Sequence, residues 1–277
     1  PMEGNAAFFR TVRADFKMGL KLPFLLAVFG VVLGFCFDNW QDLSNFFLAP
    51  LIRGENPPIC VLYYFFNSFS FGGVFSEYFA AIMAAIPFAA NYCQETNGGM
   101  SIYKISRCGK YAYARSKFLV ASMLGGMTLL LGGLIFILAL QSYLPLVTSE
   151  QIFETSWAPF SGTLIIGDGW PYFVIVLYIS FLGGALWASV GLFASAYFPS
   201  RYVAICAPFI FRFILTQIGR LLNLPNGLRL EILLCAAGKI YSDAITLAGI
   251  TAAVLVLIFL CYHLFAKRIE RRLWDVE

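Results

Sequence analysis

Charged side chains are scarce in this sequence: Asp, Glu, Lys and Arg make up 12% of its 277 residues, while apolar residues make up 60%. A water-soluble domain of this length needs more charge than that to cover its surface. The scarcity therefore excludes an ordinary soluble domain and indicates an integral membrane protein. The formal net charge of +4 does not by itself indicate a partner, and no nucleic acid is expected to bind.

Catalytic and nucleotide-binding motifs are also missing. No glycine-rich loop is followed by Lys-Ser or Lys-Thr, so the chain has no P-loop with which to bind ATP. It has no HExxH, no usable Ser-His-Asp set and no paired intramembrane carboxylates of the kind that a proton relay needs. Its single histidine, His263, argues against a metal site. We therefore expect no enzyme activity, catalytic residue, cofactor or metal in this chain.

The seven cysteines show no metal-ligand or redox spacing, so we expect them to pack as small apolar residues. A disulfide among Cys36, Cys60 and Cys235 is an alternative that the sequence leaves open.

Apolar runs of about 20 residues recur, long enough to cross a bilayer as helices. The roughly 10-residue alternating segments of a closed barrel do not occur. The sequence thus predicts an all-α, polytopic membrane protein, with a single transmembrane domain over residues 1–277 and six crossings. The crossings are predicted at about residues 22–37, 71–91, 118–140, 171–197, 203–219 and 244–266.

Two crossings depart from a simple apolar run. The fifth meets Arg212 after about ten residues and Arg220 soon after, so we expect it to be short or broken. Before the second, residues 59–69 are expected to form a membrane-dipping or external helical approach.

An amphipathic helix is predicted at the N-terminus, over residues 6–21. One row at four-residue steps is apolar and a second row is basic, a pattern typical of a helix that lies in the membrane interface. The apolar row is Phe8, Val12, Phe16 and Leu20, and the basic row is Arg13, Lys17 and Lys21. We therefore expect residues 1–21 to form an interfacial helix, acting as a plain anchor or in gating.

Positive charge is concentrated in residues 94–117, which hold five Lys or Arg residues against one acid, Glu95. Lys and Arg close to the ends of crossings resist translocation, so this segment is expected to be cytoplasmic. Both termini are expected on the same side. This arrangement, in the cytoplasmic membrane, leaves 14 of the 19 basic residues inside.

Glu77 and Arg212 are the two costly charges within or near the predicted crossings, and functional use is the default interpretation of such groups. We assign both to translocation or gating. The alternatives are a structural ion pair or a position nearer the interface.

The order of residues in the basic segment carries a resemblance. Glu95 ends the second crossing, Gly98 and Gly99 follow, Ile102 and Ile105 lie on a short helix, and Lys110 and Lys117 lead into the third crossing. With six crossings, an interfacial N-terminal helix, a tight turn at 198–202 and a partly helical insertion at 221–243, the chain resembles the permease subunits of type-two ABC exporters. Cys108 and Gly109 stand where many members have a proline and a small hydroxyl residue.

The resemblance implies that residues 94–117 are a cytoplasmic coupling segment. The chain would pair with a second permease copy and dock two copies of a separate ATPase subunit, which would hold the ATP and magnesium. Ser101 is expected to be the N-cap of a helix over residues 101–107. The coupling interface is assigned to Glu95, Gly98, Gly99, Ser101, Ile102, Lys104, Ile105, Arg107 and Lys110. The basic residues could instead only fix the topology and touch anionic lipid.

The function that this resemblance implies is ATP-driven export of an amphipathic or hydrophobic substrate, such as a peptide or antimicrobial. An ion-coupled secondary transporter and a non-transporting membrane scaffold or immunity protein are the alternatives.

Overall fold

The structure is a computed structural model that describes residues 2–45, 60–69, 73–156 and 158–274. The described residues are almost entirely helical and contain no strand. The all-α prediction is therefore confirmed for this part of the chain.

Within the described residues, four helices are long and apolar enough to cross a membrane, which fits a transmembrane protein. They are α8 (Lys110–Gln141), α10 (Trp170–Tyr197), α11 (Arg201–Leu221) and α13 (Asp243–Trp274). A fifth crossing results if α1 (Met2–Gly19) and α2 (Leu22–Asp38), which meet at a bend of 56°, are taken together. The predicted six crossings are thus matched only in part.

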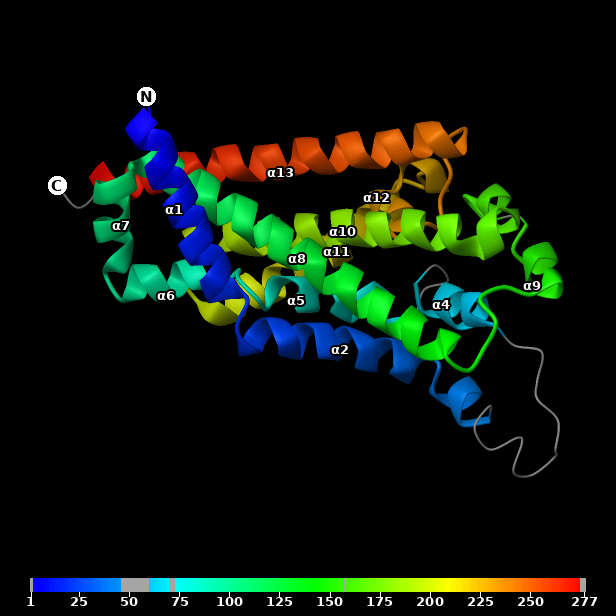
Figure 1. Ribbon diagram of the computed structural model, residues 1–277. Coiled ribbons are helices and arrows are strands. Elements are labelled where there is room, and N and C mark those ends of the chain that lie inside the picture. Colours follow the sequence, from blue (N-terminus) through cyan, green and yellow to red (C-terminus); the bar gives the residue numbers. More distant parts are fainter. Residues whose placement is uncertain (1, 46–59, 70–72, 157, 275–277) are drawn as a thin grey trace.

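The four long helices and α2 lie side by side, and α10 forms the centre of the bundle (Figure 1). In its most apolar stretch α10 is 78% buried, against 17% for α13. Glycines bring α10 close to α8: a methyl group on Gly125 would overlap the Gly184 carbonyl, and one on Gly184 would overlap that of Gly125. These two helices therefore pack closely at their glycines.

The region of the predicted second crossing is divided into shorter pieces. The π-helical segment η1 (Phe75–Phe79) leads into α5 (Ala80–Ala85), and a turn over residues 86–90 separates α5 from α6 (Asn91–Asn97). Pro87 lies in this turn, where it has no N–H to continue the helical hydrogen bonds. The start of the predicted crossing, residues 71 and 72, lies outside the described residues.

The expectation of a short or broken fifth crossing is wrong. Helix α11 runs unbroken for 21 residues, with Pro208 inside it. It buries one stripe at four-residue steps, formed by Ala204, Pro208 and Arg212. Because the Arg212 side chain finds partners inside the bundle, its charge does not end the helix.

Other boundaries differ from the prediction by several residues. Helix α8 begins eight residues before position 118, and α13 continues eight residues beyond position 266. The helical approach predicted at 59–69 is α4 (Val61–Phe69), and residue 59 lies outside the described residues. The remaining short helices are α7 (Met100–Cys108), α9 (Ser149–Glu154), η2 (Ser161–Ile165), η3 (Gly167–Gly169), η4 (Asn226–Leu228) and α12 (Leu230–Leu233).

Cys36, Cys60 and Cys235 lie among the described residues, and none of the three is in a disulfide. The structure therefore holds no disulfide among Cys36, Cys60 and Cys235.

Candidate functional site

Helix α7 lies across one end of the bundle, roughly at right angles to the long helices, and both chain termini lie at this end (Figure 1). Two glycines with positive φ bound it, Gly99 with φ of 69° and Gly109 with φ of 81°. Residues with a side chain rarely adopt such φ values, so the glycines allow the chain to turn sharply into and out of α7. We call the end that holds α7 the basic end.

Helix α7 has two different faces. Ser101 is buried, and Lys104, Ile105 and Cys108 are half-buried against the bundle. The outer face exposes Met100, Ile102, Tyr103, Ser106 and Arg107, and the exposed fraction of Tyr103 is 75%. This outer face of α7 combines apolar, aromatic and positively charged groups on one short helix.

The expected N-cap at Ser101 is wrong. The helix begins at Met100 after Gly99, which occupies the cap position, and no side chain caps the first turn. Ser101 is the second residue of the helix, where its buried side chain faces the bundle. The left-handed turn at Gly99 moves the start of the helix by one residue relative to the sequence prediction.

A buried ion-pair network lies beneath the inner face of α7. The Lys117 ammonium is 2.6 Å from Glu95 Oε1 and 3.0 Å from Asp15 Oδ1. The side chains of Lys117 and Asp15 are fully buried, and that of Glu95 is 6% exposed. These contacts join α8 to both α6 and α1.

Lys104 connects α7 to the same acids. Its ammonium lies 2.6 Å from Glu95 Oε1 and 3.4 Å from Asp15 Oδ1. The network therefore contains two carboxylates and two ammonium groups, so its formal charges cancel. Buried charges are tolerated when they are paired and hydrogen-bonded in this way.

Neutral groups complete the network. Asn91 Oδ1 accepts from Lys117 at 2.9 Å, Tyr113 donates to Glu95 Oε2 at 2.8 Å, and Ser116 donates to Asp15 Oδ2 at 3.0 Å. The buried carboxylates and the ammonium of Lys117 thus each have several partners. We call Asp15, Asn91, Glu95, Lys104, Tyr113, Ser116 and Lys117 the ionic network.

The protonation of the ionic network follows from these contacts. Burial raises the pKa of Glu95, but the attraction of Lys117 and hydrogen bonds from Lys104, Lys117 and Tyr113 outweigh burial and leave that pKa below its ordinary value. Burial lowers the pKa of Lys104, but its hydrogen bond to Glu95 and the attraction of both acids leave the pKa above its ordinary value. Both groups are therefore charged at neutral pH.

Sequence reasoning assigned Glu95 and Lys104 to the site and included Lys117 in the resemblance, but it missed four members of the network. Asp15 was the most informative omission, since it is the one acid within residues 6–21, the predicted amphipathic helix, whose other charges are basic. On α8, Tyr113, Ser116 and Lys117 are three and four residues apart, a spacing that places them on one helix face. These two signals were present in the sequence.

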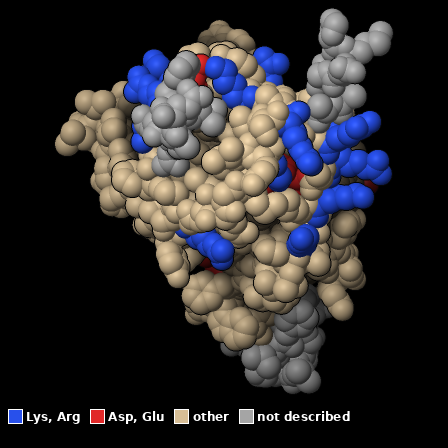
Figure 2. Space-filling view, turned by 90° about the vertical axis from the view of Figure 1, so that its left-hand side faces the viewer, with Lys and Arg blue, Asp and Glu red and all other residues tan. Residues whose placement is uncertain are grey.

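The other predicted interface residues lie at the basic end but outside the ionic network. Gly98, Ile102 and Arg107 are exposed, Ile105 packs against the bundle, and Lys110 pairs with Glu270 of α13. The basic side chains of this end are visible in Figure 2 as a ring of Lys and Arg with few acids between them.

A groove of about 530 Å³ opens on the side of the bundle between α8, α10 and α13. Phe118, Phe181 and Phe259 contribute to its largely apolar lining. Arg115 and Tyr262, which are hydrogen-bonded at 3.4 Å, add polar groups to it. The groove can accommodate an apolar chain beside the guanidinium of Arg115.

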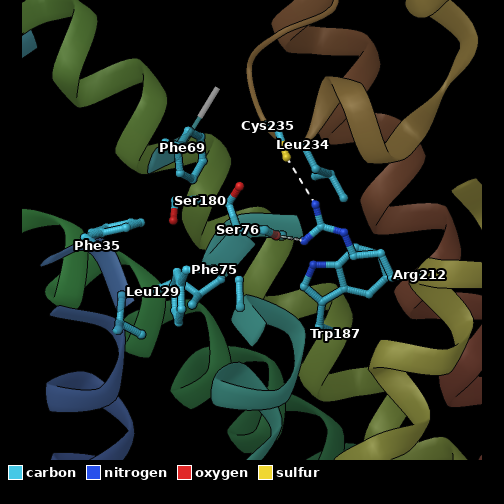
Figure 3. A pocket seen from close by; sticks show the side chains of 13 residues that line it. Phe35, Phe69, Phe75, Ser76, Leu129, Ser180, Trp187, Arg212, Leu234 and Cys235 are labelled. Carbon is cyan, nitrogen blue, oxygen red and sulfur yellow. Dashed lines mark hydrogen bonds between the residues drawn. The ribbon is translucent and has the colours of Figure 1, made fainter. Parts of the chain in front are cut away.

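The structure does not bring Glu77 and Arg212 together. Glu77 lies 3.8 Å from Arg220, whereas Arg212 reaches into a separate internal cavity beside Trp187 (Figure 3). Within the described ranges, no three His, Cys, Asp or Glu side chains are arranged to hold a metal ion.

Comparison of the chain with protein-family models, curated proteins and solved structures gives no match. The functional argument therefore rests on the geometry of this chain.

Proposed function

We propose that this chain is the membrane-spanning permease subunit of an ATP-driven exporter of the type-two ABC class. The observation that carries the proposal is the construction of α7. Its outer face is exposed at the basic end, while its inner face is tied through Lys104 to acids on α1 and α6 that also bind Lys117 of α8. A partner that binds the outer face would move these elements together.

The ionic network supplies the mechanical link in this proposal. A push on Tyr103 or Arg107 passes through the α7 backbone to Lys104, and from Lys104 to Glu95 and Asp15. Lys117 then transfers the displacement to α8, the helix that packs on α10. The partner must bind the two states of the permease with different affinities, because equal affinities would leave the equilibrium between those states unchanged.

ATP and magnesium would be held by two copies of the ATPase subunit, one beneath each of two permease copies. Helices α2 and α11 both present exposed apolar side chains, for example Phe29 and Phe213, to lipid or to the second copy. This supports a membrane-embedded dimer in which the α7 helices of both copies face the same side.

The proposed topology has six crossings and both termini in the cytoplasm of the cell that makes the protein. In a variant lacking its own cysteines, Ser106→Cys should resist an impermeant thiol reagent in intact cells and react after lysis. Ile166→Cys, also exposed but at the opposite end, is the control and should react in intact cells. Labelling of position 106 in intact cells would place α7 outside and would exclude a cytoplasmic ATPase as its partner.

The proposed cargo is amphipathic or hydrophobic, because the lateral groove offers apolar walls together with Arg115. A peptide or antimicrobial with an anionic group would suit this lining. The direction proposed for transport is outward.

The direct test is reconstitution with a candidate ATPase subunit, the first candidate being any ATPase that is encoded beside this chain. The two should purify together, and transport into inverted vesicles should require ATP and persist when proton and sodium gradients are collapsed. Loss of transport on collapse of those gradients, with ATP intact, would instead support an ion-coupled secondary transporter. If neither ATP nor a gradient drives transport, a scaffold or immunity role is favoured.

A further inference from the structure

A buried arginine lies in the middle of the bundle, far along α11 from the basic end. Arg212 is 6% exposed, although only 22% of the most apolar stretch of α11 is buried. Arginine cannot lose its proton in a protein, so this site carries a permanent positive charge. A charge buried in a membrane protein is costly and in most cases has a function.

The partners of Arg212 do not neutralise it. The guanidinium donates to the Ser76 carbonyl and to Cys235 Sγ at 3.3 Å, and it lies 5.9 Å from the ring centre of Trp187. All three are uncharged. Its Nε is buried and has no hydrogen-bond partner.

The acids close to the partners of Arg212 are engaged elsewhere. Asp38 accepts from the N–H of Phe75, the residue before Ser76. Glu77, next to Ser76 on η1, lies 3.8 Å from Arg220, and Glu231, one turn before Cys235, lies 2.8 Å from Arg229. Among the described residues, no carboxylate lies within ion-pair distance of Arg212. The charge of Arg212 is thus uncompensated by the described part of the chain.

An internal cavity of about 30 Å³ adjoins the guanidinium (Figure 3). Ser76 and Ser180 contribute polar groups to its lining, and most of the remaining lining is aromatic or aliphatic, for example Phe75 and Leu129. Ring edges carry partial positive charge and so tolerate an anion. One side of the cavity is the π-helical segment η1, a geometry that is frequent at functional sites.

We propose that this cavity is a binding site for a small monovalent anion of halide size, chloride under cellular conditions. The charge of Arg212 selects an anion, and the volume limits its size. A water molecule needs about 10–15 Å³ of such space, so the cavity has room for a single small ion but not for a phosphate or an organic carboxylate. The weakly hydrated guanidinium suits a weakly hydrated anion.

The bound anion would complete the contact between α11, η1, α10 and the turn after α12 (residues 234–236), which meet at Arg212. Because it would bind the folded bundle and not the unfolded chain, it would stabilise the fold in proportion to its concentration. This inference is independent of the proposed ATPase partner, and it is tested on the purified chain alone.

The first experiment measures thermal unfolding in detergent while chloride replaces gluconate at constant ionic strength. We expect a saturable rise of about 3 °C in the melting temperature. Bromide should act like chloride, whereas the larger gluconate and sulfate should not. Equal stabilisation by all these anions would overturn the proposal and would mean that the cavity holds water only.

The second experiment uses the ring that faces the guanidinium. Iodide bound beside Trp187 should quench its fluorescence, and the difference between wild type and Trp187→Phe isolates that signal from the other four tryptophans. Chloride should reverse the quenching by competition. Quenching that chloride does not reverse would contradict a common site.

Substitution of the arginine localises the effect. Arg212→Gln should abolish both the chloride-dependent rise in melting temperature and the competition between chloride and iodide. Arg220→Gln, on the same helix but with a side chain that is 60% exposed, should retain both effects. A chloride effect that persists in Arg212→Gln overturns the assignment. If that variant does not fold, the anion-size series and the iodide competition on the wild-type chain decide the question.

Discussion

The ammonium of Lys117 lies 3.0 Å from Oδ1 of Asp15, and both side chains are fully buried although 102 residues separate them in the sequence. The contact joins the N-terminal helix α1 to the start of α8. Glu95 and Lys104 extend it to α6 and α7. Four elements at the basic end are therefore held by one set of buried charges, and their positions should change together.

Removal of one partner from this network should be strongly destabilising. In Asp15→Asn or Lys117→Met a buried charge loses its counter-charge, and breaking a buried pair costs about 3–5 kcal/mol. The double variant Asp15→Asn with Lys117→Met should cost less than the sum of the two, because neither charge is left behind. Thermal unfolding of the four proteins in detergent gives the comparison.

The exposed pair Lys239 and Asp243 provides the control for that series, since its side chains are 48% and 36% exposed. Lys239→Met should change stability by about 0.5 kcal/mol or less, as is usual for exposed ion pairs. Strict additivity of the Asp15 and Lys117 changes would contradict a coupled network.

The glycine at the start of α7 should be sensitive to any side chain. Gly99→Ala introduces a methyl group at a φ of 69°, which costs about 1–2 kcal/mol even though no atom lies nearby to clash with it. The strain should change the orientation of α7 and so lower ATP turnover by the complex with the proposed ATPase subunit. Gly98→Ala is the matched control, because Gly98 has a φ of −87° and is also exposed. Equal effects of the two substitutions on ATP turnover would show that the turn geometry is unimportant.

The stability of the ionic network should depend on pH in a defined window. The folded pKa of Glu95 is lowered, so its contribution is present above about 4.5 and is lost as pH falls through the folded pKa. The folded pKa of Lys104 is raised, so its contribution is present below about 10.5 and is lost as pH rises through the folded pKa. Between these values the contribution of the network should be constant.

Melting temperatures of wild type and Glu95→Gln, recorded from pH 3 to 8, isolate the acid limb of this profile. The difference between the two proteins should be constant near neutral pH and should shrink as Glu95 becomes protonated below about pH 4.5. Glu150→Gln, an exposed acid at the other end of the bundle, should track the wild type throughout. A difference that does not narrow in acid would contradict the assigned charge of Glu95.

Lys104 and Arg107 lie on one short helix, but reversing the charge of each should have a different effect on the protein. Lys104→Glu places a third acid beside Glu95 and Asp15, so it should lower the melting temperature by several degrees. Arg107→Glu changes an exposed side chain, so the fold should keep its stability while ATP turnover by the reconstituted complex falls. Wild-type turnover in Arg107→Glu would remove this residue from the docking surface.

The long helices were predictable because apolar runs of membrane length leave few alternatives. Their ends were not, since α8 begins with Lys110 and includes a buried lysine, Lys117, that charge alone would assign to a loop. Arg212 misled the prediction of α11 for the same reason. A sequence shows that a residue is charged, but it does not show whether the folded chain provides a hydrogen-bond or ion-pair partner for that charge.

The basic segment was recognisable in the sequence as a candidate site, and it contains Glu95, Lys104 and Lys117 of the ionic network. Asp15 could not be placed there without knowing that α1 bends by 56° into α2 and returns across α8. The cavity at Arg212 likewise forms only where α2, η1, α8, α10 and α11 converge. Contacts between residues that are far apart in the sequence depend on tertiary packing, and residue spacing along the chain does not predict them.

Site-specific crosslinking from α7 tests the central claim most directly. A photoreactive amino acid at position 103, the exposed Tyr103, should crosslink in intact cells to a protein that carries a P-loop and hydrolyses ATP, identified by mass spectrometry. The same probe at Ile166, exposed at the opposite end, should capture no such protein. An ATPase captured from position 103 alone is the result we predict, and its absence from position 103, or its capture from both positions, would contradict the account.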